Sequence, residues 1–344
     1  MIANKVSSPT FRFLKTNQVE VELNDINPSS FGEIQKENME LNTAFSDYSF
    51  GVSEEAVKLN KDKKNLQYVF EVNHDEDLKN INIELNEEKN TLLDNIQIIA
   101  RENTKSEFII NYTTKDLAKT FRNSVLQIYA KEDSEVTIHL VTNQNQESTI
   151  WQSIGFIVEN HAKVTIYQTE IGVGKKLFSC MGKLTGNGSI FDLKGSYLLS
   201  GQEKMDFLYN VDLNGKKSNA NILVNGVQKD FSKKNFKGTL DFKRGSKGSK
   251  GSEGEYVTLL DKTVISKSLP ILLCTEEDVV GEHASSAGQI DKNIIFYIMS
   301  RGLSFDEAKS LVVKSRLVPV IDALPDKHLR ESLLEQINQI MIEK

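Results

Sequence analysis

The segment SEFII at residues 106–110 is followed by three similar ones: SEVTI at 134–138, AKVTI at 162–166 and GSIFD at 188–192. Each starts with small and polar residues and continues into β-branched or aromatic ones. The segments start 28, 28 and 26 residues apart. A near-constant period of this length is typical of a solenoid, in which each repeat is one coil stacked on its neighbours. The pattern predicts a mainly β protein with a β-helix core, and a β-sandwich with evenly spaced strands remains the alternative.

The residue composition and its pattern divide the chain into three parts. From 65 to 290, short runs rich in Ile, Val, Phe, Tyr and Thr alternate with polar and glycine-containing clusters. This alternation predicts the strands and turns of the β-helix core. Residues 1–64 are polar and mixed, and we expect a loosely built N-terminal segment with some helix. Within the core, the Gly/Ser/Lys-rich run 243–255 predicts a flexible, solvated loop.

Residues 291–344 predict a C-terminal helical domain. Gly302 is placed to end a first helix, and Ser304 with Glu307 forms a capping box that begins the next. A last helix from about Asp326 carries an apolar stripe on one face, formed by Leu329, Leu333, Ile337, Ile340 and Met341. Such helices either cap the end of the solenoid or dock a partner protein, and the pattern alone leaves both open.

Composition excludes several classes of function. A formal charge of −6 and a pI near 5.6 disfavour nucleic acid as a partner, because phosphate binding needs a basic face. We find no apolar run long enough for a membrane span and no signal-peptide core at the N-terminus. Two cysteines are too few for a disulfide framework, which fits a reducing cytoplasm. Phosphate-loop, dinucleotide, nucleophile-elbow and paired-cysteine motifs are absent, so we expect no enzyme activity of the chain alone.

One window, residues 269–291, concentrates groups that can bind a metal. It contains the thiol of Cys274, several carboxylates including Glu282, and the imidazole of His283. Thiolate, imidazole and carboxylate are ligand types that suit iron. The spacing of Cys274 and His283 matches no standard metal motif, and a buried structural cysteine is the alternative.

The same window resembles the C-terminal signature of the SufB/SufD family. The matching residues are the stretch from Ser268 to Cys274, Glu282-His283, GQID at 288–291 and FYIMSRGLS at 296–304. The order and spacing persist across the predicted change from strand to helix, which makes the match specific. The resemblance implies a right-handed parallel β-helix flanked by N- and C-terminal helical parts, in agreement with the repeat.

Departures from the SufB pattern place the chain in the SufD branch of the family. In SufB, a glutamate follows the signature histidine, and a cysteine lies at a strand start before the signature proline. Here those positions hold Ala284 and, by alignment, Glu255. The SufD functional residue in this window is a histidine, which matches His283. The resemblance therefore implies His283 as the cluster-assembly residue, with Cys274, Glu282 and Glu255 as further candidates.

The resemblance also implies partners and a substrate. A SufD-like chain would act as a cytoplasmic scaffold with SufB and the ATPase SufC, which would hydrolyse ATP. It would hold iron or a nascent iron–sulfur cluster transiently, shared with SufB, and no permanent cofactor. SufC would dock on the C-terminal helices, where we expect Leu311, Leu333, Ile337 and Met341 to take part. The alternatives are a SufB-like homodimeric scaffold, with a homodimer also possible for the isolated chain, and a carbohydrate-active β-helix protein.

Overall fold

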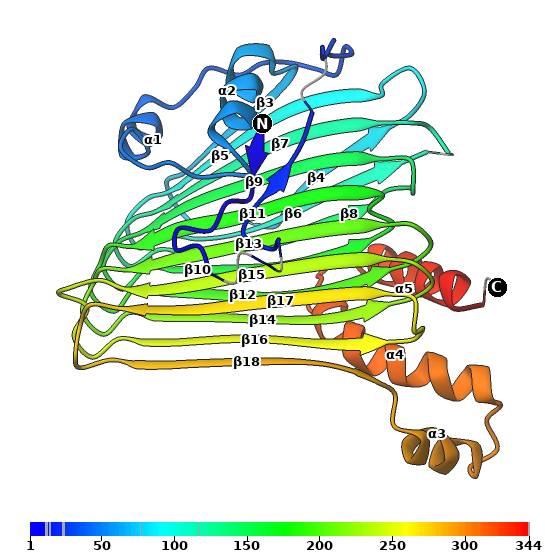
Figure 1. Ribbon diagram of the computed structural model, residues 1–344. Helices are drawn as coiled ribbons and strands as arrows, with labels where there is room; N and C mark the ends of the chain where they lie inside the picture. Colours follow the sequence, from blue (N-terminus) through cyan, green and yellow to red (C-terminus); the bar gives the residue numbers. More distant parts are fainter. Residues whose placement is uncertain (11–12, 14, 23–24, 76, 116, 343–344) are drawn as a thin grey trace.

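The computed structural model describes residues 1–344 except 11–12, 14, 23–24, 76, 116 and 343–344. Its body consists of two eight-stranded parallel sheets, which the chain enters alternately as it winds (Figure 1). The odd sheet contains β3 Leu66–Val72, β5 Thr91–Ala100, β7 Phe121–Ala130, β9 Thr149–Val158, β11 Lys175–Leu184, β13 Lys204–Leu213, β15 Lys233–Phe242 and β17 Ile265–Cys274. The even sheet contains β4 Lys79–Leu85, β6 Lys105–Thr114, β8 Glu135–Asn143, β10 Lys163–Ile171, β12 Ile190–Leu199, β14 Asn219–Gln228, β16 Lys250–Leu259 and β18 Val280–Gln289.

Within each sheet, every strand pairs in parallel with the strand two places earlier and two places later, except the edge strands β3, β4, β17 and β18, which pair on one side. The predicted β-solenoid is confirmed. The register pairs Glu135 with Lys163, as the repeat predicts. It pairs Ser106 with Val136 rather than with Ser134, a shift of two residues that keeps the side chain on the same face. The repeat also aligns 162 with 188, which would place Lys163 opposite Ser189. This alignment is wrong by one residue, because β10 pairs Lys163 with Ile190. A one-residue error turns every side chain to the opposite face.

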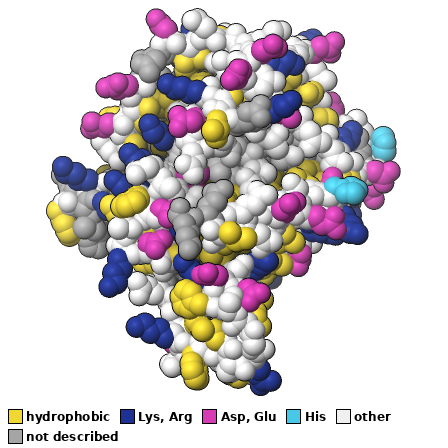
Figure 2. All heavy atoms as spheres, turned by 90° about the vertical axis from the view of Figure 1, so that its right-hand side faces the viewer, with side chains coloured by type: hydrophobic (Ala, Val, Ile, Leu, Met, Phe, Trp, Pro, Cys, Tyr) yellow, Lys and Arg dark blue, Asp and Glu magenta, His cyan; other side chains and the backbone are white. Residues whose placement is uncertain are grey.

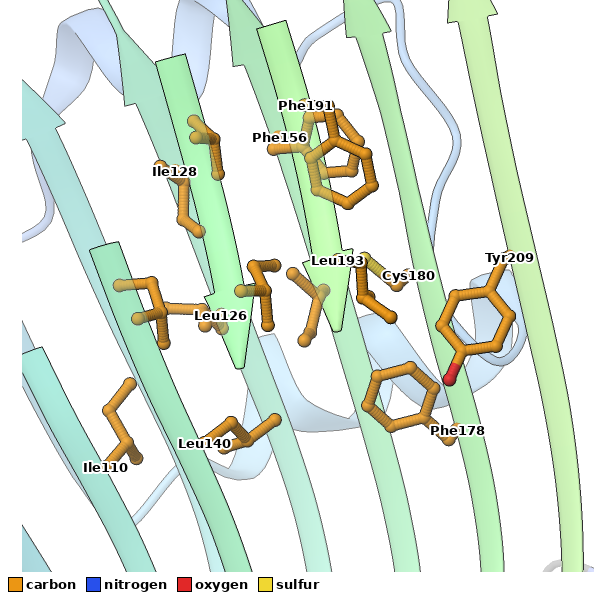
Figure 3. Close-up of a cluster of buried hydrophobic side chains, with 14 of the residues drawn as sticks. Ile110, Leu126, Ile128, Leu140, Phe156, Phe178, Cys180, Phe191, Leu193 and Tyr209 are labelled. Atoms are coloured by element: carbon orange, nitrogen blue, oxygen red, sulfur yellow. The ribbon is translucent and has the colours of Figure 1, made fainter. Parts of the chain in front are cut away.

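Alternate side chains of both sheets point inward and form one continuous core along the solenoid. Figure 3 shows this interior, with Leu126 and Ile128 of β7 in the same core as Phe156 of β9. The rings of Phe156 and Phe191 stack across it with centroids 4.1 Å apart and an interplanar angle of 13°. Parallel sheets with both faces covered need such apolar strands.

Terminal segments cover the outer faces of the two sheets (Figure 1). The N-terminal segment, with β1 Ile2–Ala3, β2 Val19–Glu20, α1 Met39–Ala44 and α2 Glu54–Lys63, lies on the odd sheet. On the even sheet lie α4 Phe305–Ile321 and α5 Lys327–Ile342, while α3 Lys292–Met299 projects beyond β18. Among the described residues, no helix combines the length and the apolar character that crossing a membrane requires.

Local signals at the helix ends were predicted correctly. The Ser304 amide donates to Glu307 Oε2 at 2.8 Å, and the Glu307 amide donates back to Ser304 Oγ at 3.3 Å. Gly302 adopts φ +97°, the left-handed conformation expected after a helix. The prediction of a flexible loop over 243–255 was wrong, because only a short turn precedes β16, whose first residue is Lys250.

Phe156 packs closely against Gly182 of β11, so adding a methyl group at Gly182 should lower the stability of the fold. A Cβ added at Gly182 would lie 2.1 Å from Phe156 Cε2, so Gly182→Ala must displace the stacked rings. We expect a loss of roughly 1–3 kcal/mol in the free energy of unfolding, measured by denaturant titration. Gly288→Ala, where the added Cβ meets nothing within 4 Å, should leave the free energy unchanged. Equal stabilities for the two variants would contradict the described packing.

Candidate functional site

The last coil of the solenoid is open, whereas the first coil is closed. Every residue of β18 is exposed, although half of its side chains point toward the solenoid axis. In the first coil the inward residues Ile81, Ile83 and Leu85 are all buried. Strands β17 and β18 are also the edges of their sheets, with unpaired backbone groups along one side. We call this end, formed by β17 and β18, the mouth of the solenoid.

His283 lies in the middle of β18 and points into the mouth. Register pairs it with Glu253 of β16, two residues from the pair formed by Gly251 and Gly281. A Cβ on either of these glycines would approach the core residue Phe242, so both glycines face inward. Side chains alternate along a strand, so Glu253 and His283, two residues further on, face inward as well. His283 therefore lies within an edge strand and not in the connection to the C-terminal helices.

Glu255 is buried one coil below the mouth and is already paired. Lys234 Nζ lies 2.6 Å from its carboxylate, and the Tyr197 hydroxyl donates to it at 3.1 Å. Burial lowers the pKa of Lys234, and the Glu255 charge partly offsets this effect. The expected position at a strand start is wrong, because Glu255 is the sixth residue of β16. In this pairing both of its oxygens are occupied, so Glu255 offers no free donor to a metal.

Cys274 lies on a different strand from His283, and Glu282 lies on the same strand but on its opposite face. Cys274 is the last residue of β17, and its exposed thiol donates to the Glu276 carbonyl at 2.8 Å in the following turn. Glu282 precedes His283 in β18, so its carboxylate points to the opposite face of the sheet. The structure therefore brings His283 next to β16 and separates it from Glu282.

Glu253, in β16 directly below the mouth, is a residue that the sequence analysis missed. Its side chain is 2% exposed, and among the described residues neither carboxylate oxygen has a hydrogen-bond partner. Burial raises the pKa of Glu253 to about 8, and the Glu255 charge adds to the rise. The alternation of Glu253 and Glu255 around Gly254 was a strand signal, hidden by the Gly/Ser-rich composition of the preceding turn.

A second group of metal-binding types lies far from the mouth, on exposed turns. One ligand atom each from Glu132, Asp133 and His161 lies within 4.8 Å of the others. His161 Nδ1 is 3.8 Å from Asp133 Oδ1, and all three side chains are exposed. Water competes fully for these groups, so the cluster by itself indicates no site.

The C-terminal helices present a different face from the one predicted. Leu333 and Ile337 are fully buried against the even sheet, so they belong to the core and offer no surface to a partner. Met341 is half-buried in the same cluster, whereas Leu311 is exposed. The exposed apolar side chains lie on α3 and the start of α4, at the lower tip in Figure 2, and include Ile294, Phe296, Tyr297, Met299 and Phe305.

This exposed surface is concave as well as apolar. A hollow of about 420 Å³ lies between the end of the even sheet and α3, lined by residues that include Leu259, Ile295, Phe296, Met299 and Phe305. Contiguous exposed apolar surface of this kind commonly marks a protein–protein contact. We call these residues of α3 and α4, together with Leu311, the tip surface.

Glu253 predicts a pH dependence of stability. Its pKa is about 8 in the folded chain and near 4.5 when unfolded, so the folded state keeps a proton that the unfolded state releases. The contribution to stability is complete below pH 4.5 and is lost as the pH rises to 8, at a cost of a few kcal/mol. Glu253→Gln removes this titration, so its stability relative to wild type should increase over that range in denaturant titrations. Parallel pH profiles would contradict the described burial.

Comparison with known proteins identifies the family. The family model described as SUF system FeS cluster assembly, SufBD core domain, matches residues 81–316. The chain is 26% identical over 250 residues to the iron–sulfur cluster assembly protein SufD of Bacillus subtilis, covering 72% of this chain and 57% of that protein's length. A SufBD family protein of Methanothermobacter thermautotrophicus is 26% identical over 240 residues, covering 68% of this chain and 57% of the relative.

A third relative, a SufBD family protein of Antithamnion sp., is 23% identical over 241 residues, covering 66% of this chain and 80% of the relative. The chain thus spans little more than half the length of the Bacillus and Methanothermobacter relatives. The matched region includes the solenoid from β4 to β18 together with α3 and most of α4. Since the family model covers more than half of the chain, the chain belongs to the SufBD core-domain family of the SUF iron–sulfur cluster assembly system.

Proposed function

We propose that the chain is a SufD-like scaffold subunit whose open mouth pairs with a SufB-like partner, with His283 at the junction. The observation that carries this proposal is the contrast between the buried first coil and the exposed, inward-facing His283 of the last coil. The substrate is iron or a nascent iron–sulfur cluster, held transiently and shared with the partner. A neutral imidazole can ligate iron beside a thiolate that the partner supplies.

Backbone hydrogen bonding supports pairing at the mouth. The edge strands β17 and β18 leave one side of their N–H and C=O groups unpaired, and a partner strand can satisfy them. A second copy of the same chain offers the same edges, so a homodimer forms through the mouth when the SufB-like partner is absent. The SufB-like homodimeric scaffold is the second candidate, and it uses the same surface.

The tip surface is the docking site of the ATPase partner SufC in this proposal. Its exposed aromatic and apolar side chains lie next to β18, so a partner bound there can move the mouth. ATP hydrolysis belongs to SufC, and the chain acts in the cytoplasm without catalytic activity of its own. Rearrangement of SufC on ATP binding opens the pairing at the mouth and gives iron access to His283.

The His283 role predicts a loss of function without a loss of structure. His283→Ala removes an exposed side chain, so the variant should fold and purify with its partners. It should fail to support iron–sulfur enzyme maturation in cells that lack the wild-type gene, because a coordinating side chain is gone. Even the loss of a residue that only supports such a ligand commonly costs about 10–100-fold in metal affinity or activity.

His161→Asn is the control for this experiment. His161 is exposed at φ +54°, a conformation that asparagine tolerates, so the substitution should not disturb the turn. Maturation should be the same as in wild type. Full activity of His283→Ala would reject the ligand role, and dissociation of its complex would show that His283 only organises the interface.

The tip surface predicts which substitution separates SufC from the chain. Phe296 is 76% exposed, so Phe296→Asp should preserve the fold and reduce SufC co-purification by at least about tenfold. Phe231→Asp is the matched control, because Phe231 is 54% exposed on a turn between β14 and β15. Truncation after Pro325 is less informative, since it would also uncover the core that Leu333 covers. Undiminished SufC binding by Phe296→Asp would place the docking site elsewhere.

A further inference from the structure

The unpaired carboxylate of Glu253 is the least explained group in the described interior. Buried ionisable side chains are normally paired or bind a metal, because removing a charge from water is costly. Glu255, two residues along the same strand, follows this rule through Lys234 at 2.6 Å. Glu253 has no such partner among the described residues, although its side chain is as well buried.

The fold reserves space for this carboxylate. A Cβ added at Gly238 of β15 would lie 1.8 Å from Glu253 Oε1, so the Glu253 side chain reaches across the interior to the odd sheet and uses the space that this glycine leaves. The carboxylate therefore lies between the two sheets, where neither of its oxygens has a hydrogen-bond partner among the described residues. A buried carboxylate without a partner calls for an explanation.

Glu253 is also the neighbour of His283 on the adjacent strand. Register pairs Glu253 with His283, and both side chains are on the inward face. Paired residues of adjacent strands are about 4.8 Å apart, a separation at which two side chains can bind one ion between them. The inward-facing residues of β18 are Gly281, His283, Ser285, Ala287 and Gln289, and the small ones next to His283 leave room beside the imidazole. Imidazole with carboxylate suits a divalent ion such as Fe²⁺.

We propose that Glu253 is a second metal ligand of the mouth, which together with His283 gives this chain its own site for one divalent iron ion. The inference rests on the proposed function, because it assigns to the same mouth a ligand that is present before any partner binds. Two protein ligands leave the remaining coordination positions to water or to a partner's thiolate. Glu255 takes no part, since Lys234 neutralises its charge.

Binding of Co²⁺ alone to the whole chain under anaerobic conditions tests the proposal. The parent protein carries His161→Asn, which disables the exposed group of Glu132, Asp133 and His161 as a competing site. The parent should bind one Co²⁺, followed by calorimetry and by visible absorption. Glu253→Gln and His283→Ala should each weaken binding by at least about tenfold and change the absorption bands.

Glu282→Gln is the matched control, because it removes a carboxylate next to His283 that points to the opposite face. It should bind Co²⁺ as the parent does. Thermal unfolding of Glu253→Gln shows whether the variant is folded, and we expect its midpoint to equal or exceed that of the parent, since a buried unpaired acid is removed. A folded Glu253→Gln that binds Co²⁺ with parental affinity overturns the proposal, as does a parent that binds none.

The outcome is distinguishable from failure of the proposed function. If His283→Ala abolishes maturation in cells while Glu253→Gln binds Co²⁺ normally, the scaffold role stands and the Glu253 ligand is rejected. If Glu253→Gln loses Co²⁺ while His283→Ala still matures clusters, the metal site stands and the scaffold role of His283 is rejected.

Discussion

Parallel in-register stacking is the constraint on which the rest of the structure depends. Each strand satisfies its backbone groups through the strands of the coils before and after it, and each inward side chain lies on its counterpart in those coils. The environment of a residue is therefore set by its coil as well as by its face. Ile83 and His283 both point inward from edge strands, yet the first is buried and the second is exposed, because the N-terminal segment caps the first coil and no described strand pairs beyond β18. Unsatisfied backbone and accessible interior occur together at the mouth, which supports the proposal that a partner binds there.

Buried charge pairs hold the two sheets in one relative register. Lys176 of β11 lies 2.6 Å from Glu170 of β10, and Lys234 of β15 makes the equivalent contact with Glu255 of β16. Each pair joins the odd sheet to the even sheet across the interior. Separating the partners would leave buried charges uncompensated, at a cost of roughly 3–5 kcal/mol per pair. These pairs contribute little net stability but exclude shifted arrangements. Glu253 differs from them because neither of its oxygens has a hydrogen-bond partner among the described residues.

The features that the sequence predicted depend on local patterns, and those it missed depend on long-range contacts. The sequence itself carries these patterns: the alternation within strands, the repeat period and the Ser304 capping box. They could therefore be predicted without knowing which distant residues meet in the fold. The stripe with Leu333 and Ile337 correctly indicated a buried face, but amphipathicity does not tell whether the chain's own sheet or another protein covers it. His283 was one of several possible ligands in the window 269–291, and only the family resemblance singled it out. Glu253 was missed because its burial depends on Gly238, which is 15 residues away and in the other sheet.

The composition of the two ends argues that the mouth is an interface rather than an unfinished terminus. Solenoids need capping at their ends, and the chain caps its first coil with its own N-terminal segment. There Gln35 and Glu33 exchange backbone hydrogen bonds with Gln67 of β3, and Phe31 packs on the core. An ordinary coil of this solenoid that lacked a cap would expose apolar inward residues to water. The inward residues of β18 are instead small or polar, so this side of the mouth tolerates water before a partner binds and leaves room for an ion beside His283. The same residues that make the mouth soluble make it the least strongly held coil, and a partner that adds strands there would stabilise the fold and complete the site in one step.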